Sequence, residues 1–359
     1  MTKIAFDEKE LEIKGYIPNR NRPDGPGKPI FNFPVTAKEA VKALYNKQSI
    51  WLPYGVENNV FCPSLIPDNI ARGFILDATS ANYTMETYGG KDMFGVEWVY
   101  VPVAGGSMEK PGNPHMLGDD VFDWKDKLTF PDIDAWDWDE SARINKEWLD
   151  NGKANFFWFL NGMGFERLIS FMGFENAAVA LLDEEQEDDL KELFQALTDL
   201  HCRMVDKAVE AYGDGIVGFT VHDDWGSQRS PFFSAECAEK FLVPGMKQLT
   251  DHIKSKGMIA DLHSCGHIED RIESIIHGGW QSWTPMPMNN TKKLYEEYGD
   301  QIIIALIDEE DPSKTPEQQA IEFVDKYYSP EKPCIVGNYG GGILSDEYCK
   351  AMYKASRMK

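Results

Sequence analysis

Short apolar runs rich in β-formers alternate with amphipathic helical patterns along most of the chain. The clearest helical patterns cover residues 188–212, 235–256, 268–277 and 316–328. The predicted strands cover residues 49–54, 95–103, 156–160, 215–221, 258–262, 280–284, 302–306 and 334–337. Such alternation is typical of a parallel sheet with a helix between consecutive strands. About eight strands favour an α/β fold closed into a (β/α)8 TIM barrel over an open sheet.

The first third of the chain is less regular. Residues 18–34 are dense in Pro, Gly and Asn, and helical periodicity begins at residues 36–46. We therefore predict an N-terminal arm over residues 1–35 and a single barrel domain over residues 36–359. Residues 83–138 are irregular and predict a loop-rich insertion, in which residues 95–103 form a hairpin excursion.

Composition excludes several classes of partner. The 36 Lys and Arg against 59 Asp and Glu give a net charge of −23, which repels phosphate backbones and argues against a nucleic-acid partner. No apolar run is long enough to span a membrane, and the N-terminus lacks the apolar core of a secretory signal. The six cysteines suggest no disulfide framework, so we expect a cytoplasmic protein with reduced thiols.

His263 and Cys265 follow a predicted strand with one residue between them. Imidazole and thiolate are both good zinc ligands, and the chemistry of TIM barrels sits at the C-terminal ends of strands. We therefore predict a metal site here. The alternative is that Cys265 is a small buried side chain and that His263 bonds a neighbouring backbone group.

His222, Asp223 and Asp224 follow another buried strand. Adjacent carboxylates at this position are candidates for a general acid, a general base or a third metal ligand, and we predict catalytic roles for all three residues. The alternatives are that the aspartates cap a turn and that His222 is a hydrogen-bonded structural histidine.

Four aromatic residues fall at or near predicted strand ends and are candidates for lining a substrate pocket, although each could equally be core packing. They are Trp158, Trp225, Trp283 and Tyr339. Tyr339 belongs to the segment GNYGGG at residues 337–342, which matches neither a dinucleotide-binding nor a P-loop pattern and is better read as a flexible loop than as a phosphate site.

Residues 223–286 combine an acidic strand end, an SP pair, a Pro-containing helix, a strand ending in H-x-C-G, a further helix and a Gly before the next strand. This order resembles the uroporphyrinogen-decarboxylase-like superfamily, as do DMFGVEWVYVPVAGG and LTFPDID upstream. The resemblance covers most of residues 51–352 and implies the barrel fold. It also implies one of two activities: cofactor-free decarboxylation, or corrinoid-linked methyl transfer in which zinc activates a thiol or a methyl ether.

The residues favour methyl transfer. The decarboxylases of the superfamily carry an Arg-rich N-terminal signature for a polycarboxylate, whereas residues 40–80 contain one Arg, Arg72. The thiol-methylating branch adds a Cys at the end of the last strand, whereas Cys334 lies at the start of that strand and Cys349 on the expected closing helix. The resemblance therefore implies zinc-assisted transfer of a methyl group from an O-methylated small molecule, foremost an aromatic methyl ether, to the Co(I) corrinoid of a partner protein.

This interpretation places the chain in anaerobic methyl metabolism. It predicts that the corrinoid protein docks on the C-terminal rim of the barrel, over His222, His263 and Tyr339. Three alternatives remain open: a decarboxylase, a methylcobalamin:thiol methyltransferase, and a non-catalytic barrel that binds a corrinoid or its carrier. A homodimer is also left open.

Overall fold

The computed structural model describes residues 4–17, 27–103, 105–337 and 345–359. The chain divides into two compact units, and each is described by itself. One unit, called the outer unit because it contains both ends of the sequence, comprises residues 1–59, 152–155 and 281–359. The other, called the central unit because it contains the middle of the sequence, comprises residues 60–151 and 156–280. The division into an arm and a single barrel domain stays a prediction.

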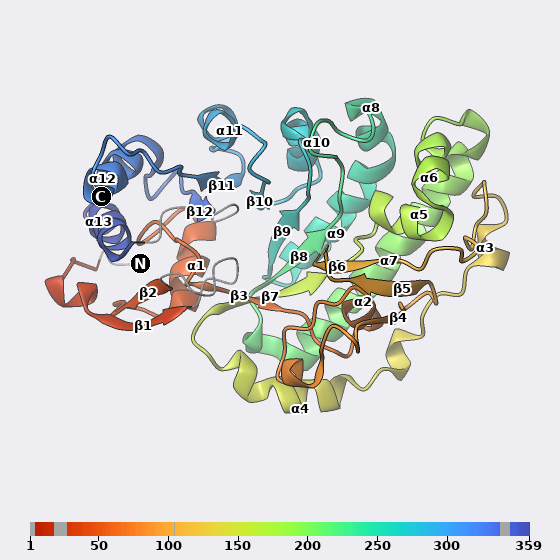
Figure 1. Ribbon diagram of the computed structural model, residues 1–359, viewed down its shortest axis with the longest axis horizontal. Coiled ribbons are helices and arrows are strands. Elements are labelled where there is room, and N and C mark those ends of the chain that lie inside the picture. The colour runs from red at the N-terminus through yellow and green to blue at the C-terminus, as the bar shows by residue number, and fades with distance from the viewer. Residues whose placement is uncertain (1–3, 18–26, 104, 338–344) are drawn as a thin grey trace. The chain divides into compact units, whose positions relative to one another are not determined.

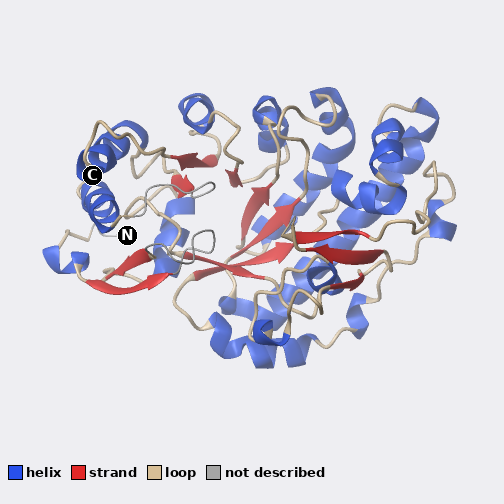
Figure 2. Cartoon of the chain, viewed as in Figure 1, coloured by secondary structure: helices blue, strands red, loops and turns tan. Residues whose placement is uncertain are grey.

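The parallel strands follow one another in chain order. In the central unit β8 (Gly218–His222) pairs in parallel with β7 (Ala154–Phe159) and with β9 (Ile259–His263). In the outer unit β11 (Ile303–Ile307) pairs in parallel with β10 (Ser282–Thr284) and β12 (Ile335–Gly337). With β3 (Asn58–Phe61) at the start of the series, the described residues contribute seven such strands, with helices in the connections between β7 and β12 (Figure 2). This order confirms the predicted α/β fold of the TIM-barrel class.

Helices of the central unit lie beside its strands, and α7 packs along both α4 and α9 (Figure 1). Its helices are α2 (Pro67–Ala71), α3 (Trp124–Lys127), α4 (Trp138–Leu149), α5 (Phe165–Met172), α6 (Phe174–Ala180), α7 (Glu187–Tyr212), α8 (Ala235–Cys237), α9 (Val243–Ser255) and α10 (Ile272–His277). A π-helical turn over Ala238–Leu242 joins α8 to α9, so the helix predicted over residues 235–256 is interrupted. Within the described residues, no helix has both the length and the apolar character needed to cross a membrane.

The predicted hairpin excursion is a three-stranded antiparallel sheet in the central unit. It consists of β4 (Gly89–Lys91), β5 (Glu97–Val101) and β6 (Gly106–Glu109). Short 3-10 turns complete this unit, over Ser80–Asn82, Ile133–Ala135, Glu184–Gln186, Gly213–Gly215 and Glu269–Arg271.

The outer unit joins the beginning of the chain to its end. It contains a 3-10 turn over Glu8–Leu11, the antiparallel pair β1 (Ile13–Ile17) and β2 (Lys28–Phe31), α1 (Ala37–Tyr45), α11 (Thr291–Tyr298), α12 (Pro316–Tyr327) and α13 (Asp346–Arg357). Buried Glu10 accepts hydrogen bonds from Tyr353 Oη (2.6 Å) and Arg357 Nε (2.8 Å). This ion pair ties the start of the chain to α13.

One predicted strand is wrong. Residues 49–54 are not a regular strand, although Trp51, Leu52 and Tyr54 are buried as expected. Pro53 has no N–H to donate to a ladder, and its carbonyl accepts a single hydrogen bond from Val336 N (2.8 Å). The series of strands therefore begins at β3.

α7 places a histidine in the core of the central unit. His201 is 1% exposed, its Nδ1 lies 2.8 Å from the carbonyl of Leu197, and its ring meets Phe159 edge-on. Burial lowers the pKa of His201 to about 4, because a charged imidazole here would lose its hydration. The ring is therefore neutral in the folded protein at neutral pH.

This histidine is expected to make the protein less stable in acid. Between about pH 6.5 and 4 the unfolded chain binds a proton at residue 201 and the folded chain does not. The free energy of unfolding therefore decreases as the pH is lowered through this range. From pH 7 to 4.5 the loss from this group is about 2–3 kcal/mol. Urea unfolding of the wild type and of His201→Asn at both pH values isolates the contribution of His201 to this loss of stability. An equal pH dependence in the two proteins would contradict the buried neutral histidine.

Candidate metal centre

Two histidines are brought together by the register of β8 and β9. His222 and His263 are the last residues of these strands and are direct partners in the parallel ladder. Their ring centroids lie 5.2 Å apart with the planes 17° from parallel. Both side chains are buried and belong to the central unit. The strand ends therefore present two imidazoles side by side.

Cys265 completes a three-donor cluster with these histidines. Ligand atoms of His222, His263 and Cys265 all lie within 4.8 Å of one another, and Cys265 Sγ is 3.7 Å from His263 Nε2. Two imidazoles and one thiolate are a donor set that suits zinc, with a fourth position left for water or a substrate. The structure brings the predicted ligands His263 and Cys265 together with His222, which was predicted as a catalytic residue, and metal binding by the three stays a prediction.

The backbone fixes the position of the thiol. Cys265 N donates to Asp224 Oδ1 (2.7 Å). Gly266 has φ +98°, and a Cβ there would lie 2.3 Å from the backbone of Gly226. Only glycine fits that contact, so the loops after β8 and β9 touch backbone to backbone directly beside the thiol.

Burial and neighbouring charges shift the pKa values of His222 and Asp224 in opposite directions. Burial alone would lower the pKa of His222, but Glu166 and Asp224 raise it well above its usual range. For Asp224, burial alone would raise the pKa, but attraction to His222 holds it well below its usual range. Burial also raises the pKa of the Cys265 thiol, so a bound cation is what would favour the thiolate.

The two predicted catalytic aspartates occupy different surroundings. Asp223 is fully buried, with Oδ2 accepting from Trp225 Nε1 (2.8 Å) and Oδ1 accepting from Glu166 N (2.9 Å). Burial raises the pKa of Asp223 to about 7. Asp224 is 29% exposed at its side chain and lies 3.2 Å from His222 Nε2. Asp223 therefore organises the backbone between β8 and α5, while Asp224 reaches the cluster; a catalytic role for either stays a prediction.

Glu166 also belongs to the site, although no pattern in the sequence indicated it. It lies on the first turn of α5, and its Oε2 is 2.9 Å from His222 Nδ1 while its Oε1 accepts from Arg72 Nη1 (2.7 Å). A carboxylate beside Nδ1 would orient the ring and leave Nε2, which lies 3.2 Å from Asp224 Oδ1, as the nitrogen available to a metal. Glu166, His222 and Asp224 also form a second cluster with mutual ligand distances within 4.8 Å, which shares His222 with the first.

Glu166→Gln is expected to weaken zinc binding by about 10- to 100-fold, because the amide no longer fixes the ring of His222 through a charged contact. Competition with a chromogenic chelator measures the affinity. Glu175→Gln is the matched control, since Glu175 is exposed on the neighbouring helix α6. Unchanged affinity in Glu166→Gln, with a normal thermal unfolding midpoint, would remove the orienting role.

A buried ionic group links α5 to Asp68 and Asp92 through Arg167. Arg167 is fully buried, donates from Nη1 to Asp92 Oδ2 (2.9 Å) and contacts Asp68 through Nη2. Asn161 Nδ2 donates to Asp68 Oδ1 (3.1 Å), and Trp98 Nε1 donates to Asp92 Oδ2 (3.1 Å). Because Glu166 precedes Arg167 on the helix, this group also holds the carboxylate that faces His222.

The predicted aromatic lining is only partly gathered at the cluster. Trp158 is half-buried, and its ring centroid lies 5.8 Å from that of His263. Trp225 is fully buried and bonded to Asp223. Trp283 is fully buried in β10 of the outer unit. Tyr339 lies outside the described residues. Within the described part of the central unit, Trp158 lies against the cluster.

Comparison with known proteins adds little to this geometry. No family model and no curated protein match the chain. Among solved structures, Dispersin B is 12% identical over 62% of this chain and 76% of its own, with a TM-score of 0.28. A xylose isomerase-like TIM-barrel protein from Mycobacterium smegmatis, in complex with magnesium, is 12% identical over 61% and 78%, with a TM-score of 0.31. The fold class therefore rests on the strand order itself.

Proposed function

We propose that this protein is a zinc-dependent methyltransferase. It takes a methyl group from an O-methylated small molecule, foremost an aromatic methyl ether, and passes it to the Co(I) corrinoid of a partner protein. The observation that carries the proposal is the cluster of His222, His263 and Cys265, which combines donors suited to zinc at the strand ends where TIM barrels carry their chemistry.

In this proposal the side chains have distinct tasks. Zinc held by the three donors would polarise the ether oxygen of the methyl donor. Glu166 fixes His222, and Asp224 fixes Cys265 by accepting its backbone N–H. Trp158, half-buried beside His263, offers an aromatic face for the donor ring. Asp224, partly exposed beside the donors and ionised at neutral pH, would accept hydrogen bonds next to the oxygen that loses its methyl group, and water would supply the proton that this oxygen takes up.

The described cysteines favour the ether donor over a thiol acceptor. Cys334 is fully buried, and its Sγ donates to the carbonyl of Tyr327 (3.3 Å) in the outer unit. Cys349 is buried in α13 of the same unit. Neither belongs to a metal-type cluster of the described residues, in which the third donor is the imidazole of His222.

The direct test is methyl transfer to cobalt. The zinc-loaded protein is incubated with cob(I)alamin and a panel of methoxylated aromatic and aliphatic compounds, and methylcobalamin is followed by its absorbance. We expect turnover with at least one donor and a loss of about 100-fold or more in Cys265→Ala. Carbon dioxide released from an acidic substrate without cobalt would favour the decarboxylase instead. Binding of cobalamin without turnover across the panel would favour the non-catalytic barrel.

A further inference from the structure

Arg72 contacts the carboxylate that faces His222. It is the C-cap residue of α2, and its Nη1 donates to Glu166 Oε1 (2.7 Å). The other oxygen of Glu166, Oε2, lies 2.9 Å from His222 Nδ1. The side chains of Arg72 and Glu166 are only 18% and 11% exposed, so solvent screens this contact weakly. The guanidinium and the imidazole therefore share one carboxylate, and each takes one of its oxygens.

Two further contacts restrict the guanidinium of Arg72. The amide oxygen of Asn161 accepts a hydrogen bond from Nη1, the same nitrogen that donates to Glu166. The indole ring of Trp98 lies against the group, with its centroid 4.8 Å from Cζ. Stacking on an aromatic face adds attraction and restrains the plane of a guanidinium. Arg72 is therefore held in the orientation in which it reaches Glu166.

Asn161 is itself held by its backbone and by a buried partner. It lies two residues after the end of β7 and has φ +63°, which is uncommon for a residue with a side chain. Its Nδ2 donates to Asp68 Oδ1 (3.1 Å), and the residue is fully buried. Backbone conformations of this kind cost free energy and persist where the surrounding structure imposes them. Here the strained backbone places one amide between Asp68 and Arg72.

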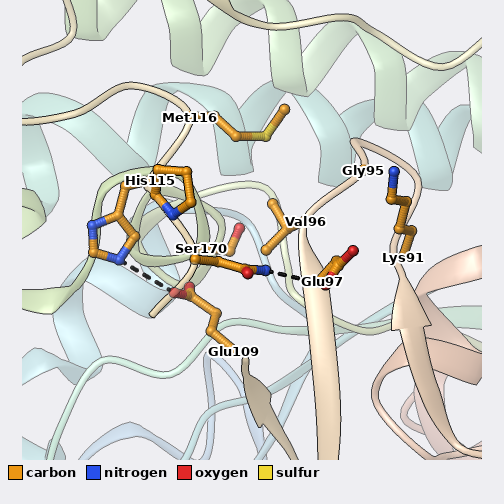
Figure 3. A pocket seen from close by; sticks show the side chains of 10 residues that line it. Lys91, Gly95, Val96, Glu97, Glu109, His115, Met116 and Ser170 are labelled. Carbon is orange, nitrogen blue, oxygen red and sulfur yellow. Dashed lines mark hydrogen bonds and ion pairs between the residues drawn. The ribbon is translucent and has the colours of Figure 1, made fainter. Parts of the chain in front are cut away.

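The carboxylate of Glu109 is also near Arg72 but has a different partner. Glu109 is the cross-strand partner of Trp98 in the β5–β6 pair. Burial raises the pKa of Glu109, and His115 and Arg72 partly oppose this shift. Its Oε2 lies 3.5 Å from His115 Nε2, and Figure 3 shows the two side chains turned toward each other. Among the described residues, Glu166 is therefore the carboxylate in contact with Arg72.

These contacts form one continuous network from the β4–β5–β6 sheet to the three-donor cluster, entirely within the central unit. In order, its members are Asp92, Arg167, Asp68, Asn161, Arg72, Glu166 and His222. Trp98 of β5 contacts this network at two points, through a hydrogen bond to Asp92 and through its ring against Arg72. The sheet therefore supplies part of the outer support of the metal centre.

We propose that Arg72 is a positioning residue of the metal centre. It holds Glu166 against His222 Nδ1, which keeps the ring in the orientation that leaves Nε2 to the metal. The inference rests on the proposed function in one respect, because it needs a zinc ion bound by His222, His263 and Cys265. Arg72 is not one of these donors, so its loss is expected to weaken zinc binding without abolishing it.

The test measures zinc affinity by competition with a chromogenic chelator, and ligand geometry by the visible absorption of the Co(II)-substituted protein. Arg72→Met keeps much of the side-chain volume and is expected to weaken zinc binding by about tenfold and to alter the Co(II) spectrum. Arg72→Lys keeps the charge but not the forked geometry, so it is expected to recover part of the affinity. Glu109→Gln removes the carboxylate that Arg72 does not contact, and as the matched control it is expected to bind zinc like the wild type.

A double variant shows whether Arg72 acts through Glu166. If it does, Arg72→Met combined with Glu166→Gln is expected to bind zinc no more weakly than Glu166→Gln alone. Additive losses would overturn the proposal, as would wild-type affinity and an unchanged Co(II) spectrum in Arg72→Met. Thermal unfolding establishes that each variant is folded, and Arg72→Gln replaces Arg72→Met in both comparisons if the latter is not.

The failure of this inference and the failure of the proposed function give different results. Absence of zinc binding in the wild type would remove the proposed function, and the positioning role with it. Normal zinc binding in the wild type, with equal affinity in the Arg72 variants, would overturn the positioning role alone and leave the metal centre standing.

Discussion

His222→Ala is expected to lower the zinc content of the purified protein from about one ion per chain to near zero at micromolar free zinc. With His222 removed, two protein donors remain from the three-donor cluster, and the carboxylate of Glu166 loses the ring that it orients. Methyl transfer is expected to fall with the metal, by about 1000-fold or more. Metal analysis by mass spectrometry, after dialysis against a weak chelator, measures the first effect.

The matched comparisons are His263→Ala and Cys265→Ala, which are expected to lose zinc to the same degree. His252→Ala is the control, because His252 pairs with Asp206 at the surface of the same unit. Full zinc retention in His222→Ala, together with loss in the other two, would show that His222 is only a partner of Glu166 and Asp224. The third ligand would then have to be sought elsewhere.

Arg167→Met is expected to destabilise the protein by about 3–5 kcal/mol. The substitution keeps much of the side-chain volume but leaves Asp68 and Asp92 buried together without their shared cation. Two buried carboxylates without a neighbouring cation repel each other and have lost their hydration. Urea unfolding at pH 7 measures the change in the free energy of unfolding.

A triple variant separates charge from packing. Adding Asp68→Asn and Asp92→Asn to Arg167→Met removes all three charges, so part of the lost stability is expected to return. Lys125→Met is the surface control, since its pair with Glu192 is exposed and worth less than about 1 kcal/mol. A loss below 1 kcal/mol in Arg167→Met, or no recovery in the triple variant, would show that the buried charges are not coupled as described.

The residues of this site that could be predicted from the sequence are those at or just after the ends of strands. The H-x-C spacing and the position of His263 and Cys265 after an apolar run were enough to propose them as ligands. His222 ends the preceding strand, and in a parallel ladder of consecutive strands equivalent ends come together. Register alone could therefore have placed the imidazole of His222 beside that of His263 and suggested it as a third candidate ligand.

The residues of the site that could not be predicted lie in the segments that connect the strands. Glu166 and Arg167 are adjacent in sequence, yet one faces His222 and the other is buried between Asp68 and Asp92. Helical periodicity does not say that a short helix after β7 will bury its charged residues, because that depends on partners some 75–100 residues away in the chain. Likewise, Pro53 removed a donor from a run that otherwise had the composition of a strand.

The backbone contact between Gly226 and Gly266 has a consequence for directed evolution of this protein. Any library that randomises the two loops for new substrates must keep residue 266 as glycine, because a Cβ there would lie 2.3 Å from the Gly226 backbone, whereas a Cβ at residue 226 would meet Ile268 Cγ2 at 2.6 Å. A loop from another parent is therefore tolerated when it leaves this close backbone approach intact. A recombination experiment with chimeric loops should recover folded, zinc-binding clones mainly when residue 266 remains glycine.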